Sequence, residues 1–261
     1  MYAAGITAGA LVLAGAALDV RGWTLSIALV FTIAWMAYIL DRVKVLRRWQ
    51  DPADRMANPG RDDWVARNRR ALLACAGLLG LAALVLAALV DPWLTMLVPA
   101  GAASVIVYGS RPSESRRVRP KDVLVLKNVL TGLAYATLVG CVLWAMLPDA
   151  RGLWRALAVV ALVVTGDAML CDIDDTPSDA SFGTTTVAVL AGRHWATALA
   201  VVVYAAAVVV WMKLGLRTAG PGAFALGMPA TGLVISRLGR VRTPIDLRGG
   251  AIGLLALFLM P

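Results

Sequence analysis

The sequence predicts an all-α integral membrane protein, with about nine transmembrane helices in one bundle around a central cavity. Composition supports this first, because 60% of the 261 residues are hydrophobic and only 16% are charged. Soluble domains average about 45–50% apolar and about 25% charged residues. The apolar residues also form long continuous runs, and a helix pairs its backbone groups internally, as lipid requires. These two observations exclude a soluble enzyme and a disordered protein.

Nine apolar runs approach the roughly 20 residues that a helix needs to cross a bilayer. In chain order they are 3–18, 22–40, 71–90, 93–108, 123–147, 156–170, 195–212, 222–235 and 249–260. The runs are continuous rather than alternating, which favours helices over a transmembrane β-barrel. We expect the helices to form a single domain over residues 1–261.

Basic residues are distributed unevenly between the loops that alternate along nine helices. One set of loops holds 19 of the 25 Lys and Arg residues, at 41–70, 109–122, 171–194 and 236–248, and the opposite set holds five. Under the positive-inside rule, this predicts a cytoplasmic N-terminus and an outer C-terminus in the cytoplasmic membrane. The net charge of +9 is explained by this topology, so no nucleic-acid partner is expected. The sequence does not indicate an oligomeric state.

Five of the sixteen acidic residues lie between residues 167 and 179, where the sixth run meets the predicted cytoplasmic side. At 100° per residue, Asp172, Asp175 and Asp179 fall within about 60° of one another on a helix, whereas Asp174 points away and is expected to be solvated. Clustered carboxylates repel one another unless a cation holds them. Mg²⁺ suits such a cluster, because it binds through one or two carboxylates while it keeps waters and a substrate phosphate.

Two features leave alternatives open at this cluster. A solvated acidic loop would also explain the aspartates without any metal. In addition, Pro177 either disturbs the helix, because proline lacks a backbone donor, or opens a new helix after Thr176. In the second case the shared face of the aspartates is only approximate.

The residues after the cluster complete a longer motif. The pattern Asp-x-x-Asp-x-x-x-Asp, followed by Gly183, Thr186 and Gly192, resembles the second aspartate-rich motif of UbiA-like membrane prenyltransferases. The resemblance implies Mg²⁺-dependent transfer of a prenyl group from an isoprenyl diphosphate to a small aromatic or lipophilic acceptor, at a site facing the cytoplasm. It also implies metal binding by the three motif aspartates, with Asp175 and Asp179 as catalytic residues.

The first motif of that family, Asn-x-x-x-Asp-x-x-x-Asp, is eroded in this chain. If Asp41 is its middle aspartate, Ala37 replaces the asparagine and Val45 replaces the last aspartate. Asp54 is the alternative, because it opens a segment similar to the Asp-Arg-x-x-x-Pro-x-Arg tail of the motif. We expect Asp41 to be the catalytic residue and metal ligand, since it ends a membrane helix that can pack rigidly.

Cationic side chains are expected beside a diphosphate, because they stabilise its charge as the C–O bond breaks. Lys127 stands next to Asn128 about one turn inside an apolar run, and an ionisable residue there is a functional candidate. Asp167 is placed similarly, and it either pairs with Lys127 or assists the site. The other candidate diphosphate ligands, for which a topological or lipid-headgroup role is the alternative, are Arg42, Arg55, Arg61, Arg111 and Lys121.

Three other functions remain open at this point. A terpene cyclase on the same fold would ionise the same diphosphate without an acceptor. A non-catalytic homologue would bind isoprenoid or lipid without turnover, which the eroded first motif allows. A transporter is less favoured, because the acidic residues lie at the membrane edge rather than at the midplane. The sequence identifies neither the acceptor nor the prenyl chain length.

Overall fold

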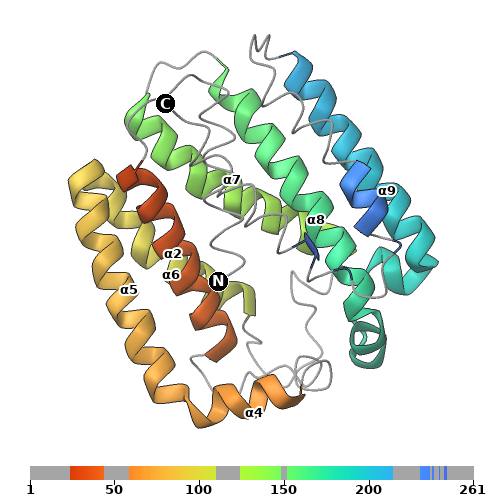
Figure 1. Cartoon of the computed structure of the whole chain (residues 1–261), viewed down its shortest axis with the longest axis horizontal. Helices are drawn as coiled ribbons and strands as arrows, with labels where there is room; N and C mark the ends of the chain where they lie inside the picture. The colour runs from red at the N-terminus through yellow and green to blue at the C-terminus, as the bar shows by residue number, and fades with distance from the viewer. Residues whose placement is uncertain are drawn as a thin grey trace.

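The computed structural model describes residues 24–43, 59–109, 124–147, 152–213, 230–235, 237, 241 and 244–245. All regular secondary structure in these ranges is helical. The principal helices are α2 (Thr24–Val43), α4 (Pro59–Arg67), α5 (Arg69–Val90), the 3-10 helix η2 (Pro92–Met96), α6 (Leu97–Gly109), α7 (Leu126–Met146), α8 (Leu153–Phe182) and α9 (Val187–Met212). They pack side by side as a bundle (Figure 1).

Six of the predicted apolar runs coincide with these helices. Five of them, α2, α5, α7, α8 and α9, are long and apolar enough to cross a membrane, and a shorter apolar helix covers Pro92–Val105. The runs 3–18 and 249–260 lie outside the described residues, and only the end of the run 222–235 is described. The prediction of a helical membrane protein is confirmed for the described part. The total of nine helices and the sidedness stay predictions.

The helices pack in two neighbouring groups. Helix α2 packs against α5 and α6, α8 packs against α7 and α9, and α2 also contacts α7. The end of α8 and the starts of α7 and α9 share one end of the bundle, because residues 183–186 join α8 to α9 and the first residues of α7 contact Asp172 of α8 (Figure 1). The short helix α4 lies toward the same end. Because α7 and α8 run antiparallel, the motif aspartates of α8 lie beside the first residues of α7.

Small residues allow α7 and α8 to approach closely. Helix α7 buries Asn128, Gly132, Ala136 and Gly140, which recur every fourth residue on one face. A Cβ added at Gly132 would lie 2.4 Å from the carbonyl oxygen of Ala161 on α8. Lipid offers no hydrophobic driving force between helices, so their association depends on such close packing.

Helix α8 is longer than the predicted run 156–170. It contains Pro177 in its interior, so Pro177 does not open a new helix. Because proline has no N–H, the carbonyl of the residue four positions earlier lacks its usual donor. Pro177 is exposed, so water can hydrogen-bond that carbonyl instead. A 30-residue helix is about 45 Å long, against roughly 30 Å of hydrocarbon core. The aspartate-bearing end of α8 is therefore an extension beyond the apolar part of the helix.

Candidate active site

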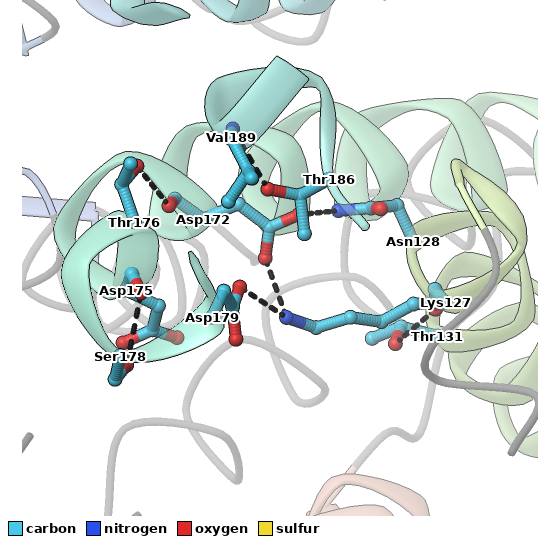
Figure 2. A network of polar contacts seen from close by, with 10 residues as sticks. All are labelled: Lys127, Asn128, Thr131, Asp172, Asp175, Thr176, Ser178, Asp179, Thr186 and Val189. Carbon is cyan, nitrogen blue, oxygen red and sulfur yellow. Dashed lines mark hydrogen bonds and ion pairs between the residues drawn. The ribbon is translucent and has the colours of Figure 1, made fainter. Parts of the chain in front are cut away.

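The site begins at the first turn of α7. Helix α7 starts at Leu126, directly after Val125, which has a positive φ of 62° with a ψ of −31°. A β-branched residue adopts positive φ only under constraint from its surroundings. This turn places Lys127 and Asn128 at the start of α7, from where both side chains reach α8 (Figure 2).

Asp172 of α8 lies at the centre of the polar contacts. Its Oδ1 accepts a hydrogen bond from Lys127 Nζ at 2.6 Å, and its Oδ2 accepts one from Asn128 Nδ2 at 3.0 Å (Figure 2). The residue is only 4% exposed. A buried carboxylate is tolerated when it is paired and hydrogen-bonded, and these two side chains provide both conditions.

Asp179 lies two helical turns after Asp172 and on the same side of α8. Its Oδ2 is 3.8 Å from Lys127 Nζ, so the ammonium lies between two carboxylates. Asp175 lies one turn before Asp179, is half-buried and lies farther from Lys127 in Figure 2. Its backbone carbonyl accepts a hydrogen bond of 2.9 Å from the Ser178 hydroxyl.

The remaining motif residues shape the junction between α8 and α9. Gly183 ends α8 with a φ of 73°, in the left-handed conformation that glycine favours at this position. Thr186 begins α9 as its N-cap, and its Oγ1 accepts a hydrogen bond of 3.2 Å from Val189 N. Gly192, with φ 82° and ψ 174°, forms a kink inside α9. The glycines and threonine of the motif therefore have structural roles beside the aspartates.

The expected four-carboxylate metal site is not gathered in one place. Among the residues that the structure describes, no three Asp, Glu, His or Cys side chains lie close enough to hold one metal ion. Lys127 occupies the space between Asp172 and Asp179. Asp175 and Asp179, one turn apart on α8, still fit Mg²⁺, because this ion needs only one or two carboxylates beside waters and a substrate phosphate.

The predicted residues outside α7 and α8 have different outcomes. Asp41 and Arg42 end α2, where Arg42 Nε lies 3.8 Å from Asp41 Oδ2 and the guanidinium stacks 4.9 Å from the ring centroid of Tyr38. Arg61 belongs to α4, but its side chain is not among the described ones. The other candidates also lie outside the described residues, namely Asp54, Arg55, Arg111 and Lys121.

Two further aspartates differ from the expectations. Asp174 is not simply solvated, because both its carboxylate oxygens accept from Val241 N, at 3.0 and 2.9 Å. Asp167 is buried and accepts a hydrogen bond from the hydroxyl of Tyr204 on α9, whereas Lys127 pairs with Asp172. The sequence did not predict Tyr204 as the partner of Asp167. Its only signal was that Asp167 is an ionisable residue inside an apolar run.

The sequence model of the UbiA prenyltransferase family matches residues 66–249, which is most of the chain. The chain belongs to the UbiA prenyltransferase family. The match confirms the resemblance that the second aspartate-rich motif indicated. No curated protein sequence matches the chain.

Two solved structures share the fold of this UbiA family member. One is the apo structure of a UbiA homologue from Aeropyrum pernix K1, with a TM-score of 0.70 and 20% sequence identity. The other is a UbiA homologue from Archaeoglobus fulgidus bound to DMAPP and Mg²⁺, with a TM-score of 0.64 and 13% identity. Each match covers 98% of this chain and 97% of the other. At these identities, the comparison shows a common fold over nearly the whole UbiA chain.

Proposed function

We propose that this protein transfers a prenyl group from an isoprenyl diphosphate to a small aromatic or lipophilic acceptor within the membrane. The observation that carries the proposal is the polar cluster of Lys127, Asp172 and Asp179 at one end of two apolar helices. Membership of a prenyltransferase family supports the reaction class. The homologue bound to DMAPP and Mg²⁺ supports an isoprenyl diphosphate donor and Mg²⁺ as the cofactor.

We assign metal binding to Asp175 and Asp179 on α8, with Asp41 of α2 as a further ligand. Bound Mg²⁺ supplies positive charge that stabilises the diphosphate leaving group. The two α8 carboxylates are separated by one helical turn, and the structure places them at the extended end of the helix. This location suits a charged headgroup at the boundary of an apolar bundle.

Lys127 binds a diphosphate oxygen in this proposal. Its ammonium stabilises the negative charge that develops on the leaving oxygen as the C–O bond of the allylic donor breaks. The prenyl chain then lies among the apolar helices, away from water. Further diphosphate ligands of the same proposed site are the cations Arg42, Arg55, Arg61, Arg111 and Lys121 and the neutral amide of Asn128. The positive-inside prediction places this site at the cytoplasmic face of the cytoplasmic membrane.

A second candidate function is isoprenoid binding without turnover. The observation that favours it is the end of α2, where Ala37 and Asp41 stand in the positions of the asparagine and middle aspartate of the first motif. A site with fewer carboxylates on α2 retains diphosphate binding more readily than it retains two metal ions. Turnover therefore has to be tested separately from binding.

The test uses purified protein in lipid nanodiscs with Mg²⁺, allylic diphosphates of increasing chain length and a panel of acceptors. We expect pyrophosphate release that depends on Mg²⁺, together with a prenylated acceptor detected by mass spectrometry. A hydrocarbon product without acceptor would establish a cyclase instead. Diphosphate binding without release across the whole panel would establish the non-catalytic binder.

Variants assign the reaction to the site. Asp175→Asn or Asp179→Asn should lower pyrophosphate release by about 100-fold or more, which is typical for the loss of a group that stabilises transition-state charge. The matched control is Asp63→Asn, because Asp63 is an exposed aspartate of α4. Wild-type activity in both α8 variants would contradict the assignment.

A further inference from the structure

We propose that Asp172 and Asn128 are positioning residues that hold the Lys127 ammonium beside Asp179, ready to bind the diphosphate, and that Asp172 is not a metal ligand. The inference rests on the proposed function, because that function supplies the diphosphate. It divides the three motif aspartates into two tasks. Asp172 orients a cation, whereas Asp175 and Asp179 bind the metal.

Both oxygens of the Asp172 carboxylate already have partners on α7. One of its oxygens accepts from Lys127 at 2.6 Å and the other accepts from Asn128 at 3.0 Å. Its side chain is 6% exposed. Burial of a charge is costly unless a partner and hydrogen bonds compensate it, and here both come from α7. The charge of Asp172 is therefore balanced by the protein itself, without a metal ion.

The Lys127 ammonium lies closer to the carboxylate of Asp172 than to that of Asp179. An ammonium has three donors, and Asp172 uses one of them at hydrogen-bond distance. The Nζ to Asp179 Oδ2 distance of 3.8 Å is an ion-pair distance but exceeds a hydrogen bond. The lysine side chain is 21% exposed. Within the part of the chain that the structure describes, the ammonium is thus tethered on the Asp172 side and keeps donors for an incoming oxyanion.

The two helices that carry these residues pack closely against each other. Asn128 and Gly132 lie on the same buried face of α7, four residues apart. At Gly132, an added Cβ would lie 2.2 Å from Thr165 Oγ1 and 2.4 Å from Ala161 O, so α7 and α8 touch through their backbones. A lysine side chain is flexible by itself. Fixing it before the substrate binds lowers the cost of ordering it during binding.

The experiment separates metal binding from diphosphate binding. Mn²⁺ is titrated by electron paramagnetic resonance on nanodisc protein saturated with an unreactive prenyl thiolodiphosphate. We expect Asp172→Asn to bind Mn²⁺ within about twofold of wild type, and Asp179→Asn to bind it at least about tenfold more weakly. Equal losses of Mn²⁺ affinity in both variants would overturn the proposal, because Asp172 would then behave as a metal ligand.

The second titration measures affinity for the thiolodiphosphate at saturating Mn²⁺. Loss of a hydrogen bond involving a charged group corresponds to about tenfold in affinity, so Asp172→Asn and Lys127→Gln should each weaken binding by about that factor. The double variant should bind no more weakly than Lys127→Gln alone, because Asp172 acts only through Lys127. Additive losses would contradict this coupling. Asp174→Asn is the control, since it removes a charge from the same helix and should leave both affinities within about twofold.

Two outcomes distinguish this inference from the proposed function. A wild-type protein that binds no diphosphate analogue would overturn both. If Asp172→Asn binds the thiolodiphosphate with the same affinity as the wild type, the positioning role alone is overturned. If Lys127→Gln fails to fold because it leaves Asp172 buried without its cation, the double variant removes both charges and should recover the fold. Asn128→Ser then provides the second test, with a weaker affinity for the analogue and unchanged Mn²⁺ binding.

Discussion

The hydroxyl of Tyr204 on α9 donates a hydrogen bond to a carboxylate oxygen of Asp167 on α8, in the buried interior of the bundle. The tyrosine ring lies against Gly166 of α8 and Gly232 of the segment 230–235. A Cβ added at these glycines would lie 2.6 and 2.8 Å from ring atoms. One side chain therefore joins three parts of the chain, and two glycines provide the space for its ring.

Tyr204→Phe should lower the free energy of unfolding by about 1–3 kcal/mol, because it removes a donor from a buried carboxylate. Thermal or denaturant unfolding in detergent micelles measures the change. Tyr38→Phe is the matched control, since it keeps the aromatic ring over the Arg42 guanidinium. Equal stability of Tyr204→Phe and wild type would show that the hydrogen bond contributes nothing to the fold.

Gly132→Ala should destabilise the contact between α7 and α8 by about 1–3 kcal/mol, since the added methyl group has no space against Ala161 and Thr165. The shift of α7 should also weaken binding of the diphosphate analogue, because Lys127 moves relative to Asp172. Gly77→Ala on α5 is the control, as nothing lies within 4 Å of its added Cβ. Equal free energies of unfolding for Gly132→Ala and Gly77→Ala would contradict the prediction.

Gly192→Ala should cost about 1–3 kcal/mol, because φ 82° with ψ 174° is a conformation that essentially only glycine adopts. The cost arises in the backbone, since no atom lies within 4 Å of the added Cβ. Gly183→Asn should cost less, because asparagine tolerates the left-handed conformation at a helix C-terminus. Unfolding midpoints of the two variants test the order, and a cost of Gly183→Asn equal to or larger than that of Gly192→Ala would contradict it.

Asp174→Ala should accelerate hydrogen exchange at the amide of Val241 by at least about tenfold, because both carboxylate oxygens accept from that amide. Exchange measured by mass spectrometry on peptides around residue 241 reports the change. The amide of Val189, which Thr186 caps, serves as an internal reference and should be unaffected. Unchanged exchange at Val241 would mean that other contacts hold this segment.

Cysteine labelling tests the predicted sidedness of the bundle. In a background without Cys75, Cys141 and Cys171, we expect Pro92→Cys to react with an impermeant maleimide in intact cells. Ser181→Cys, at the exposed end of α8, should react only after permeabilisation. The expectation follows from the basic residues on the Ser181 side. The opposite labelling pattern would place the aspartates outside the cell.

The predicted outline of the protein came from local properties of the chain. Composition and continuous apolar runs are sufficient to predict a helical membrane bundle, because each run by itself must satisfy its backbone in lipid. The motif from Asp172 to Gly192 predicted the family, since its spacing is a property of one continuous segment. Even there, the sequence did not show that α8 continues through Pro177, because exposure of that proline decides whether its lost hydrogen bond is tolerated.

The partners of the aspartates were decided only by the tertiary structure. Asp172 meets Lys127 from 45 positions away, Asp167 meets Tyr204 from 37, and Asp174 meets Val241 from 67. Helical periodicity predicts which residues share a face, but it does not specify how far one helix slides or rotates against another. Close backbone contacts such as that of Gly132 with Ala161 set this register. The sequence by itself therefore determined the class of the protein and the segment that carries its carboxylates, whereas helix packing decided which carboxylate holds the lysine.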